Sequence, residues 1–378
     1  MNKNSLEELK IFIEKHHYKG YDPYDALKSP LFKLPFFKSN KLVRFGTQQL
    51  VKRLPFSIRS LLFVPKGYNP VTLGLSIQAY TYLINSQPSN KDKYLKKINF
   101  LISELETLVP DGFSGACWGY DFDWEARHAK IPAYQPTVVA TGIITNALFV
   151  AHDYTGNKDA EKLLLSAADF VVKDLKRTYE DDTFCFSYSP FDQQKVLNAS
   201  MKGARLLAQA YSINKNKEYK DLAKKAVDYV INKQNNDGSW GYSMVKTGGW
   251  IDNYHTGYIL DCLDEYQKLT NDLEYSSNIK KGYTFYINHF ITDKGEPKFY
   301  HNKKLPIDCT AASQTILTTI RFGDKDIAKK VANYMHKEMQ QSNGGFKFRK
   351  FNNYTITTSF MRWSNAWMFT ALAYLENE

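Results

Sequence analysis

QPTVVATGIITNALFVAHDYTG, residues 135–156, is followed closely by DAEKLLLSAADFVVKDL, residues 159–175. Both segments repeat apolar residues at helical spacing, and together they indicate a helical hairpin. The first is moderately apolar and rich in small residues, which is typical of a buried helix. The second is amphipathic and rich in charge, which is typical of a helix exposed to solvent.

This pairing recurs along most of the chain. Less charged helices begin near residues 69, 135, 197, 250, 306 and 359, and a Lys-rich amphipathic helix follows each of the first five. A period of about 53 to 66 residues with two helices per unit indicates a stacked array. We therefore predict an all-α fold, an (α/α)6 toroid with the less charged helices inside.

The predicted toroid lacks a sixth outer helix at its C-terminal end, so a helix within residues 4–62 is expected to close the ring. We predict two parts, a basic N-terminal arm at 1–66 that packs on the ring and a toroid domain at 67–378. The arm holds 13 Lys or Arg against 5 Asp or Glu, and no acidic residue occurs from Ala26 to Lys91. Packing on the main domain is expected for this arm, with peripheral contact to a membrane surface as the alternative.

Aromatic residues alternate, as in short strands, just before the later inner helices. The segments are SGACWGYDFDW (114–124), FCFSYSPF (184–191), GSWGYS (238–243), PKFYHN (297–302) and GGFKFRKF (344–351). They predict β-hairpins or extended loops on the rim formed by the N-terminal ends of the inner helices. Unpaired N–H groups of several helix N-termini are expected to converge there and to attract an anion.

Composition limits the class of protein. A hydrophobic content of 43% and a charged content of 24% are those of a globular chain, and no apolar stretch is long enough to cross a membrane. Four cysteines without a CxxC pair and the lack of a signal-peptide pattern predict a cytoplasmic location, with contact to the inner face of the membrane as an option. The net charge of +11 favours an anionic partner, and no nucleic-acid-binding motif is present.

Catalytic candidates cluster at the predicted start of the fourth inner helix, WIDNYHTGY (250–258). His255 lies in the first turn, where it could act as a general acid or base near neutral pH, and a packed histidine is the alternative. Asp252 and Asp308 could be acid/base carboxylates, but aspartate is also a preferred N-cap. Tyr254 and Tyr188 complete the catalytic candidates.

Substrate-binding candidates come from the same junctions. Arginine can clamp a carboxylate through two hydrogen bonds, and aromatic rings can stack on sugar faces or act as packing pegs between repeats. The candidates are Trp118, Tyr120, Asp123, Trp124, Arg127, Asn198, Trp250, Asn253, Arg362 and Trp363. The spacing of His, Cys and acidic residues predicts no metal site, and no phosphate- or dinucleotide-binding loop predicts a cofactor.

Two motifs resemble those of other α/α toroids. QNNDGSW (234–240) and QQSNGGF (340–346) resemble the QW motif of terpenoid cyclases and the related repeats of protein prenyltransferases. IDCTAA (307–312) resembles the acid motif of oxidosqualene cyclases without its closing glutamate. This resemblance implies isoprenoid chemistry with Asp308 as the acid.

A wider resemblance runs from about residue 55 to the C-terminal region. SGACWGYDFDWEAR, FCFSYSPFD, VLNAS, QNNDGSW, WIDNYHTGY, LPIDCTA and MRWSNAWM, in this order, resemble toroid proteins encoded in bacterial and archaeal capsule and O-antigen loci. The resemblance implies synthesis or modification of a surface polysaccharide. VLNASMKGARLLAQAY is also similar to the helical domain of heparan-type glucuronyl C5-epimerases.

Three classes of function follow. The first is an enzyme acting on an acidic glycan or a lipid-linked oligosaccharide, as a uronate C5-epimerase or lyase in which His255, Tyr254, Tyr188 or Tyr120 removes a proton, or as a glycoside hydrolase. The second is a terpenoid cyclase or prenyl-diphosphate enzyme, whose cavity should be largely apolar and aromatic. The third is a noncatalytic glycan-binding protein, which would tolerate the loss of His255.

Overall fold

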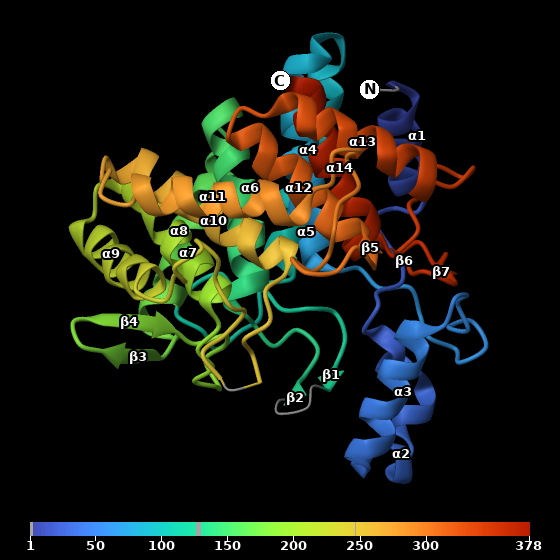
Figure 1. Cartoon of the computed structure of the whole chain (residues 1–378). Coiled ribbons are helices and arrows are strands. Elements are labelled where there is room, and N and C mark those ends of the chain that lie inside the picture. Colours follow the sequence, from blue (N-terminus) through green and yellow to red (C-terminus); the bar gives the residue numbers. More distant parts are fainter. Residues whose placement is uncertain (1–2, 126–129, 246) are drawn as a thin grey trace.

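The computed structural model describes residues 3–125, 130–245 and 247–378 (Figure 1). Within these ranges it confirms the predicted (α/α)6 toroid. Six inner helices contact one another in cyclic order, and the last returns to the first, so the ring is closed. They are α4 (Pro70–Ser86), α6 (Val138–Thr155), α8 (Leu197–Asn214), α10 (Asn253–Thr270), α12 (Cys309–Arg321) and α14 (Trp367–Asn377), the last preceded by a π-helical turn, η4 (Met361–Ala366).

An outer layer of amphipathic helices surrounds this ring. Five follow the inner helices in sequence: α5 (Lys91–Thr107), α7 (Lys158–Lys173), α9 (Lys217–Ile231), α11 (Ser276–Phe290) and α13 (Lys325–Met339). The N-terminal helix α1 (Lys3–Lys15) packs against α14 and occupies the sixth outer position. Its Lys10 donates to Tyr94 of α5 at 3.2 Å, while Ser5 donates to Gln340 beside α13 at 2.6 Å.

Two copies of the Gln-x3-Gly-x-aromatic motif join neighbouring outer helices in the same way. The Nε2 of Gln234 donates to the carbonyl of Gly238 at 3.0 Å and to that of Asn278 on α11 at 3.0 Å. Gln340 repeats this with Gly344 at 3.1 Å and with Ser5 of α1 at 2.9 Å. Both glycines have positive φ, at 96° and 89°, and a Cβ there would collide with a carbonyl of the next outer helix. The motif is thus a structural link between repeats.

The aromatic junctions pair with the inner helices through backbone hydrogen bonds. The first N–H of α6, α8, α10 and α12 donates to the carbonyl of Tyr188, Tyr242, Phe299 and Phe348, respectively, at 2.9 to 3.2 Å. Asp252 caps the third N–H group of α10 and Asp308 that of α12, while α8 has no side-chain cap. The first N–H groups of these four helices are therefore paired with the neighbouring junctions and are not open to an anion, contrary to the expectation of unpaired groups there.

The rim contains short strands, as predicted for most junctions. β1 (Trp124–Glu125) pairs with β2 (Lys130–Ile131), β3 (Arg177–Glu180) with β4 (Thr183–Phe186), and β6 (Arg349–Lys350) lies between β5 (Ile307–Asp308) and β7 (Thr355–Ile356). All four of these pairings are antiparallel. Segments 238–243 and 297–302 form isolated bridges instead of strands: Ser243 pairs with Val196, and Tyr300 pairs with Asp252.

Between α1 and α4 the chain forms an arm that projects beside the strand-bearing rim (Figure 1). The arm contains α2 (Pro35–Ser39), α3 (Lys41–Arg53) and the short turns η1 (Asp25–Lys28) and η2 (Pro30–Lys33), and a further turn, η3 (Pro88–Asn90), follows α4. Arg44 of α3 anchors the arm to Glu125 of β1 at 2.9 Å. In the described ranges, no helix has the length and apolar content that a bilayer crossing requires.

Candidate active site

A cavity of about 420 Å³ opens at the rim, where the junctions and the first turns of the inner helices meet the arm. Its wall is rich in aromatic rings and carries several basic side chains. The described residues that line it are Tyr24, Lys52, Arg53, Tyr120, Phe122, Trp124, Val139, Ile143, Tyr188, Asn198, Tyr242, Trp250, Asp252, Tyr254, His255, Tyr258, Phe299, Tyr300, Arg349, Arg362, Trp363 and Trp367.

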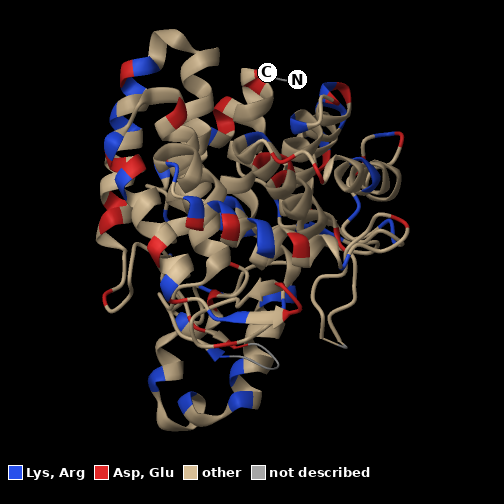
Figure 2. Ribbon diagram, turned by 90° about the vertical axis from the view of Figure 1, so that its left-hand side faces the viewer, with Lys and Arg blue, Asp and Glu red and all other residues tan. Residues whose placement is uncertain are grey.

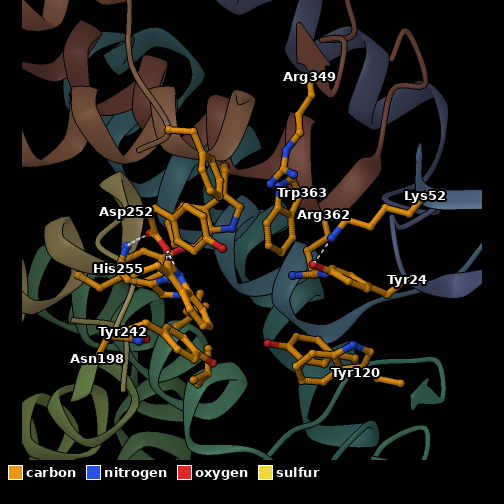
Figure 3. A pocket seen from close by; sticks show the side chains of 18 of the residues that line it. Tyr24, Lys52, Tyr120, Asn198, Tyr242, Asp252, His255, Arg349, Arg362 and Trp363 are labelled. Carbon is orange, nitrogen blue, oxygen red and sulfur yellow. Dashed lines mark hydrogen bonds and ion pairs between the residues drawn. The ribbon is translucent and has the colours of Figure 1, made fainter. Parts of the chain in front are cut away.

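His255 and Asp252 form a hydrogen-bonded pair on one wall of the cavity (Figure 3). The Nδ1 of His255 lies 2.7 Å from Oδ2 of Asp252, so a carboxylate acceptor places the ring hydrogen on Nδ1. Oδ1 of the same carboxylate accepts from the backbone N–H of His255 at 3.1 Å. Nε2 is therefore left as the basic nitrogen of a ring that Asp252 holds through Nδ1.

Aromatic side chains surround this pair. Tyr242 stacks on Trp250, with ring centroids 4.4 Å apart, and its ring lies 4.6 Å from that of His255. The indole N–H of Trp250 donates to Oδ2 of Asp252 at 2.9 Å, so both carboxylate oxygens accept hydrogen bonds from the protein. Burial raises the pKa of Tyr188, Tyr242 and Tyr254 above the ordinary tyrosine range. These phenols therefore keep their hydrogens at neutral pH, which makes them hydrogen-bond donors.

A tyrosine–lysine pair lies across the cavity from His255 (Figure 3). The phenol oxygen of Tyr24 accepts from Nζ of Lys52 at 2.5 Å. Burial acts to raise the pKa of Tyr24, but the positive charges of Lys52, Arg349 and Arg362 outweigh it and leave the pKa below its ordinary value. Burial also lowers the pKa of Lys52. A proton is therefore shared more evenly between these two groups than between free side chains.

Two arginines, Arg362, which is buried, and Arg349, which is partly buried, complete the cationic side of the cavity. Arg362 binds Asp22 through both Nε and Nη2, at 2.6 and 2.9 Å, and its guanidinium lies 4.7 Å from the ring centre of Tyr120. Arg349 of β6 donates to Asp308 at 2.5 Å. The aspartates hold the two guanidinium groups in place, while N–H groups that these bonds do not use remain for a ligand.

The cavity brings together ten of the predicted site residues: Tyr120, Trp124, Tyr188, Asn198, Trp250, Asp252, Tyr254, His255, Arg362 and Trp363. Others lie outside it. Asp308 is fully buried as the N-cap of α12 and the partner of Arg349, so the capping alternative describes it better than an acid role. Arg127 lies outside the described residues.

Three further candidates have structural contacts instead of a place in the cavity wall. Trp118 is fully buried, and its indole donates to the carbonyl of Leu105 at the end of α5. The side chain of Asn253 bonds to Thr315 of the neighbouring inner helix and to Tyr286 of α11. Asp123 pairs with Arg44 of the arm at 3.3 Å. These contacts assign the three residues to packing of the repeats and the arm.

Sequence reasoning missed the arm residues Tyr24, Lys52 and Arg53, together with Arg349. Only tertiary packing brings Tyr24 and Lys52 to the rim, so no local pattern marks them. Arg349 lies in the stretch GGFKFRKF (344–351), where aromatic and basic residues alternate. This alternation predicts a position on the rim, and it is the signal by which Arg349 could have been found. Within the described residues, no three His, Cys, Asp or Glu side chains gather as metal ligands would.

No protein-family model and no curated protein sequence matches this chain. Solved structures do match its fold. A cellobiose 2-epimerase from Bacillus thermoamylovorans aligns with a TM-score of 0.62 over 99% of each chain at 11% identity. A family 76 glycoside hydrolase from Bacteroides thetaiotaomicron gives 0.60 over 99% of each chain at 10% identity. An unsaturated glucuronyl hydrolase specific for heparin gives 0.56 over 82% of this chain and 87% of that chain at 13% identity.

The proteins with these matching structures are carbohydrate-active enzymes built on the (α/α)6 toroid. Identities of 10 to 13% show that this chain shares their fold. A shared fold does not determine the chemistry of the cavity, which depends on the residues that line it.

Proposed function

We propose that this chain is a carbohydrate-active enzyme that removes a proton from C5 of a uronate residue in an acidic glycan, as a C5-epimerase or a lyase. The observation that carries the proposal is the His255–Asp252 pair, which faces a cationic wall across an aromatic cavity. A base opposite fixed positive charge suits abstraction of a proton next to a carboxylate. The resemblance to toroid proteins of capsule and O-antigen loci supports a surface polysaccharide as the source of that glycan.

In the proposed reaction, Nε2 of His255 takes the C5 proton. Asp252 holds the ring in the required tautomer and stabilises the imidazolium that forms. The electron pair of the broken C–H bond moves into the substrate carboxylate, where Arg362 and Arg349 neutralise the developing charge. Tyrosine and tryptophan rings of the wall provide stacking surfaces for the sugar.

Tyr24 is the proposed second proton-transfer group. It lies on the wall opposite His255, and Lys52 holds its hydroxyl oxygen. An epimerase needs a proton donor on the face of the sugar opposite the base, and this pair supplies one. In a lyase the electron pair instead expels the glycosidic oxygen at C4, and the same pair would protonate that oxygen.

Glycoside hydrolysis fits the cavity less well. The usual mechanism needs two carboxyl groups on either side of the scissile bond. Among the described residues of the cavity wall, Asp252 is the one carboxylate, and three hydrogen bonds already engage it. A terpenoid cyclase is also disfavoured, because Asp308 lies outside the cavity and four Lys or Arg side chains of the described residues line it.

The test is incubation of the protein with uronate polysaccharides in D2O. Deuterium at C5 indicates epimerase activity, and absorbance from an unsaturated uronate indicates a lyase. We expect His255→Ala to lower either signal by at least about 100-fold, the typical contribution of a general base. His289→Ala is the matched control, because His289 stacks on Phe285 in the outer helix α11, away from the cavity.

The Tyr24→Phe variant tests the second group. In an epimerase it should still exchange deuterium on the face that His255 reaches, while inversion at C5 is lost. Equal activity of wild type and His255→Ala would contradict the assignment of the base. A wild-type protein that binds uronate polysaccharides but gives neither signal would support the noncatalytic alternative.

A further inference from the structure

The helix α3 of the arm turns two polar side chains toward the body and leaves large apolar side chains exposed. Its buried residues are Arg44, Gln48 and Val51, and Gln48 accepts from the backbone N–H of Glu125 in β1 at 3.2 Å. Leu42 and Leu50 lie on the side of the helix away from Arg44 and Gln48, since eight positions at 3.6 residues per turn place them about 80° apart around the helix. Leu42 is 81% exposed and Leu50 is 60% exposed. Two exposed leucines on a helix that is anchored mainly by polar side chains indicate a surface that has a partner.

Exposed apolar side chains are concentrated on and near this arm. Nineteen large apolar side chains are exposed in the described part of the chain, and eight of them lie between residues 31 and 63. These eight are Leu31, Leu34, Phe36, Leu42, Leu50, Phe56, Leu61 and Phe63. The concentration is too strong for scattered surface residues, which need no explanation.

The same segment carries positive charge without compensation by acidic residues of its own. Lys33, Lys38 and Lys41 are exposed on the tip of the arm, and the sequence has no Asp or Glu from 26 to 91. Figure 2 shows this projecting tip with Lys and Arg and without acidic residues. Apolar side chains interleaved with lysines match the two layers of an anionic bilayer surface, its acyl chains and its charged headgroups.

We propose that the docking face, defined as Lys33, Leu34, Phe36, Lys38, Leu42 and Leu50, binds the surface of an anionic lipid bilayer. The apolar side chains insert at the level of the headgroup–acyl boundary, and the lysines contact lipid phosphates. Self-association through this face is disfavoured, because a two-fold interface would bring the lysines of one copy against those of the other.

Docking by this face would hold the cavity close to the bilayer, since Lys52 of the same helix lines the cavity. This consequence rests on the proposed function: the favoured substrate would then be an acidic glycan still linked to a membrane lipid. The docking itself is independent of the reaction, so the two can fail separately.

The test is co-sedimentation of the full chain with vesicles of phosphatidylcholine alone or with 30% phosphatidylglycerol, a composition chosen on the order of that of an anionic membrane surface. We expect binding to the anionic vesicles that weakens in high salt. The double variant Phe36→Ser/Leu42→Ser and the charge reversal Lys33→Glu/Lys38→Glu should each lower the fraction bound by at least about tenfold, as expected when binding needs both apolar insertion and electrostatic attraction. Leu273→Ser is the matched control, because Leu273 is 69% exposed on the body of the toroid.

Three outcomes would overturn the proposal: no binding of wild type to anionic vesicles, equal loss in the Leu273→Ser control, or a wild-type dimer in solution that Phe36→Ser/Leu42→Ser converts to a monomer. The last would assign the face to a second copy of the chain. Unchanged turnover of a water-soluble uronate oligosaccharide by the docking variants would show that the cavity is intact. Circular dichroism of each variant establishes that a lost signal is not a loss of folding.

Discussion

At the scale of single residues, Asp252 combines two tasks that the sequence left as alternatives. Its Oδ1 caps α10, and its Oδ2 orients His255, so capping and a functional role are met by one carboxylate. The combination is possible because the capped residue is the histidine itself. The position of the ring therefore depends on the start of the helix.

Replacing Asp252 separates the two tasks. Asn is as good an N-cap as Asp, so Asp252→Asn should change the free energy of unfolding by less than about 1 kcal/mol. The amide no longer favours the required tautomer or stabilises an imidazolium, so we expect C5 proton exchange to fall by about 10² to 10⁴-fold. Thermal unfolding and the D2O assay measure the two effects. Asp252→Ala should lose both, and equal exchange in Asp252→Asn and wild type would contradict the proposed role.

At the scale of elements, inner helices approach closely where one of them has a glycine. A Cβ at Gly142 of α6 would lie 2.8 Å from Cβ of Lys202 on α8, and one at Gly257 of α10 would lie 2.6 Å from Cγ of Gln314 on α12. The small residues noted in the sequence of the inner helices therefore permit close packing between neighbours.

Gly142→Ala tests this packing. We expect a loss of about 1 to 3 kcal/mol in the free energy of unfolding, because the helices must separate or shift. Gly46→Ala on α3 is the matched control, since nothing lies within 4 Å of the added methyl group. Helix propensity should make that variant more stable, by up to about 1 kcal/mol. Chemical denaturation measures the change in unfolding free energy of each variant. If the inner helices were loosely packed, Gly142→Ala would not be destabilised relative to Gly46→Ala.

Lys202 of α8 makes the stability of the folded toroid depend on pH. Its ammonium lies 3.6 Å from the ring centre of Tyr258 on α10, and burial lowers its pKa to about 7. Arg205 lowers this pKa further, while Cys262 and Asp261 oppose the shift. Above the folded pKa and below the ordinary lysine value, the unfolded chain binds more protons. Stability should therefore rise with pH through this window.

We expect Lys202→Met to remove this rise. The difference in unfolding free energy between wild type and the variant should change by at least about 1 kcal/mol between pH 7 and pH 9, since one unit of pKa displacement corresponds to about 1.4 kcal/mol. Denaturant titrations of both proteins across this range measure the difference. A difference that is flat with pH would mean that Lys202 titrates normally in the folded state.

At the scale of the whole molecule, closure of the outer layer depends on α1. Leu9 of this helix is fully buried between the inner ring and its outer neighbours, whereas Ile11 is 55% exposed. Leu9→Ala should cost about 2 to 5 kcal/mol, the usual range for a buried leucine. Ile11→Ala, which removes a similar apolar side chain, should change stability by less than about 0.5 kcal/mol. Thermal unfolding of the pair measures how firmly the N-terminal helix belongs to the toroid.

The sequence by itself determined the toroid, because the apolar pattern of each helix distinguishes inner from outer helices and the inner pattern occurs six times. It also determined that the starts of the inner helices form a rim, and it identified His255 and Asp252 there. Tertiary structure alone decided which rim residues face the cavity. Trp118 and Asn253 contact neighbouring repeats instead, and Asp308 is buried beside Arg349. Tyr24 and Lys52 reach the cavity from the arm. The physical reason is that the spacing of apolar residues shows which face of one helix is buried, whereas a cavity wall depends on contacts between segments far apart in the chain.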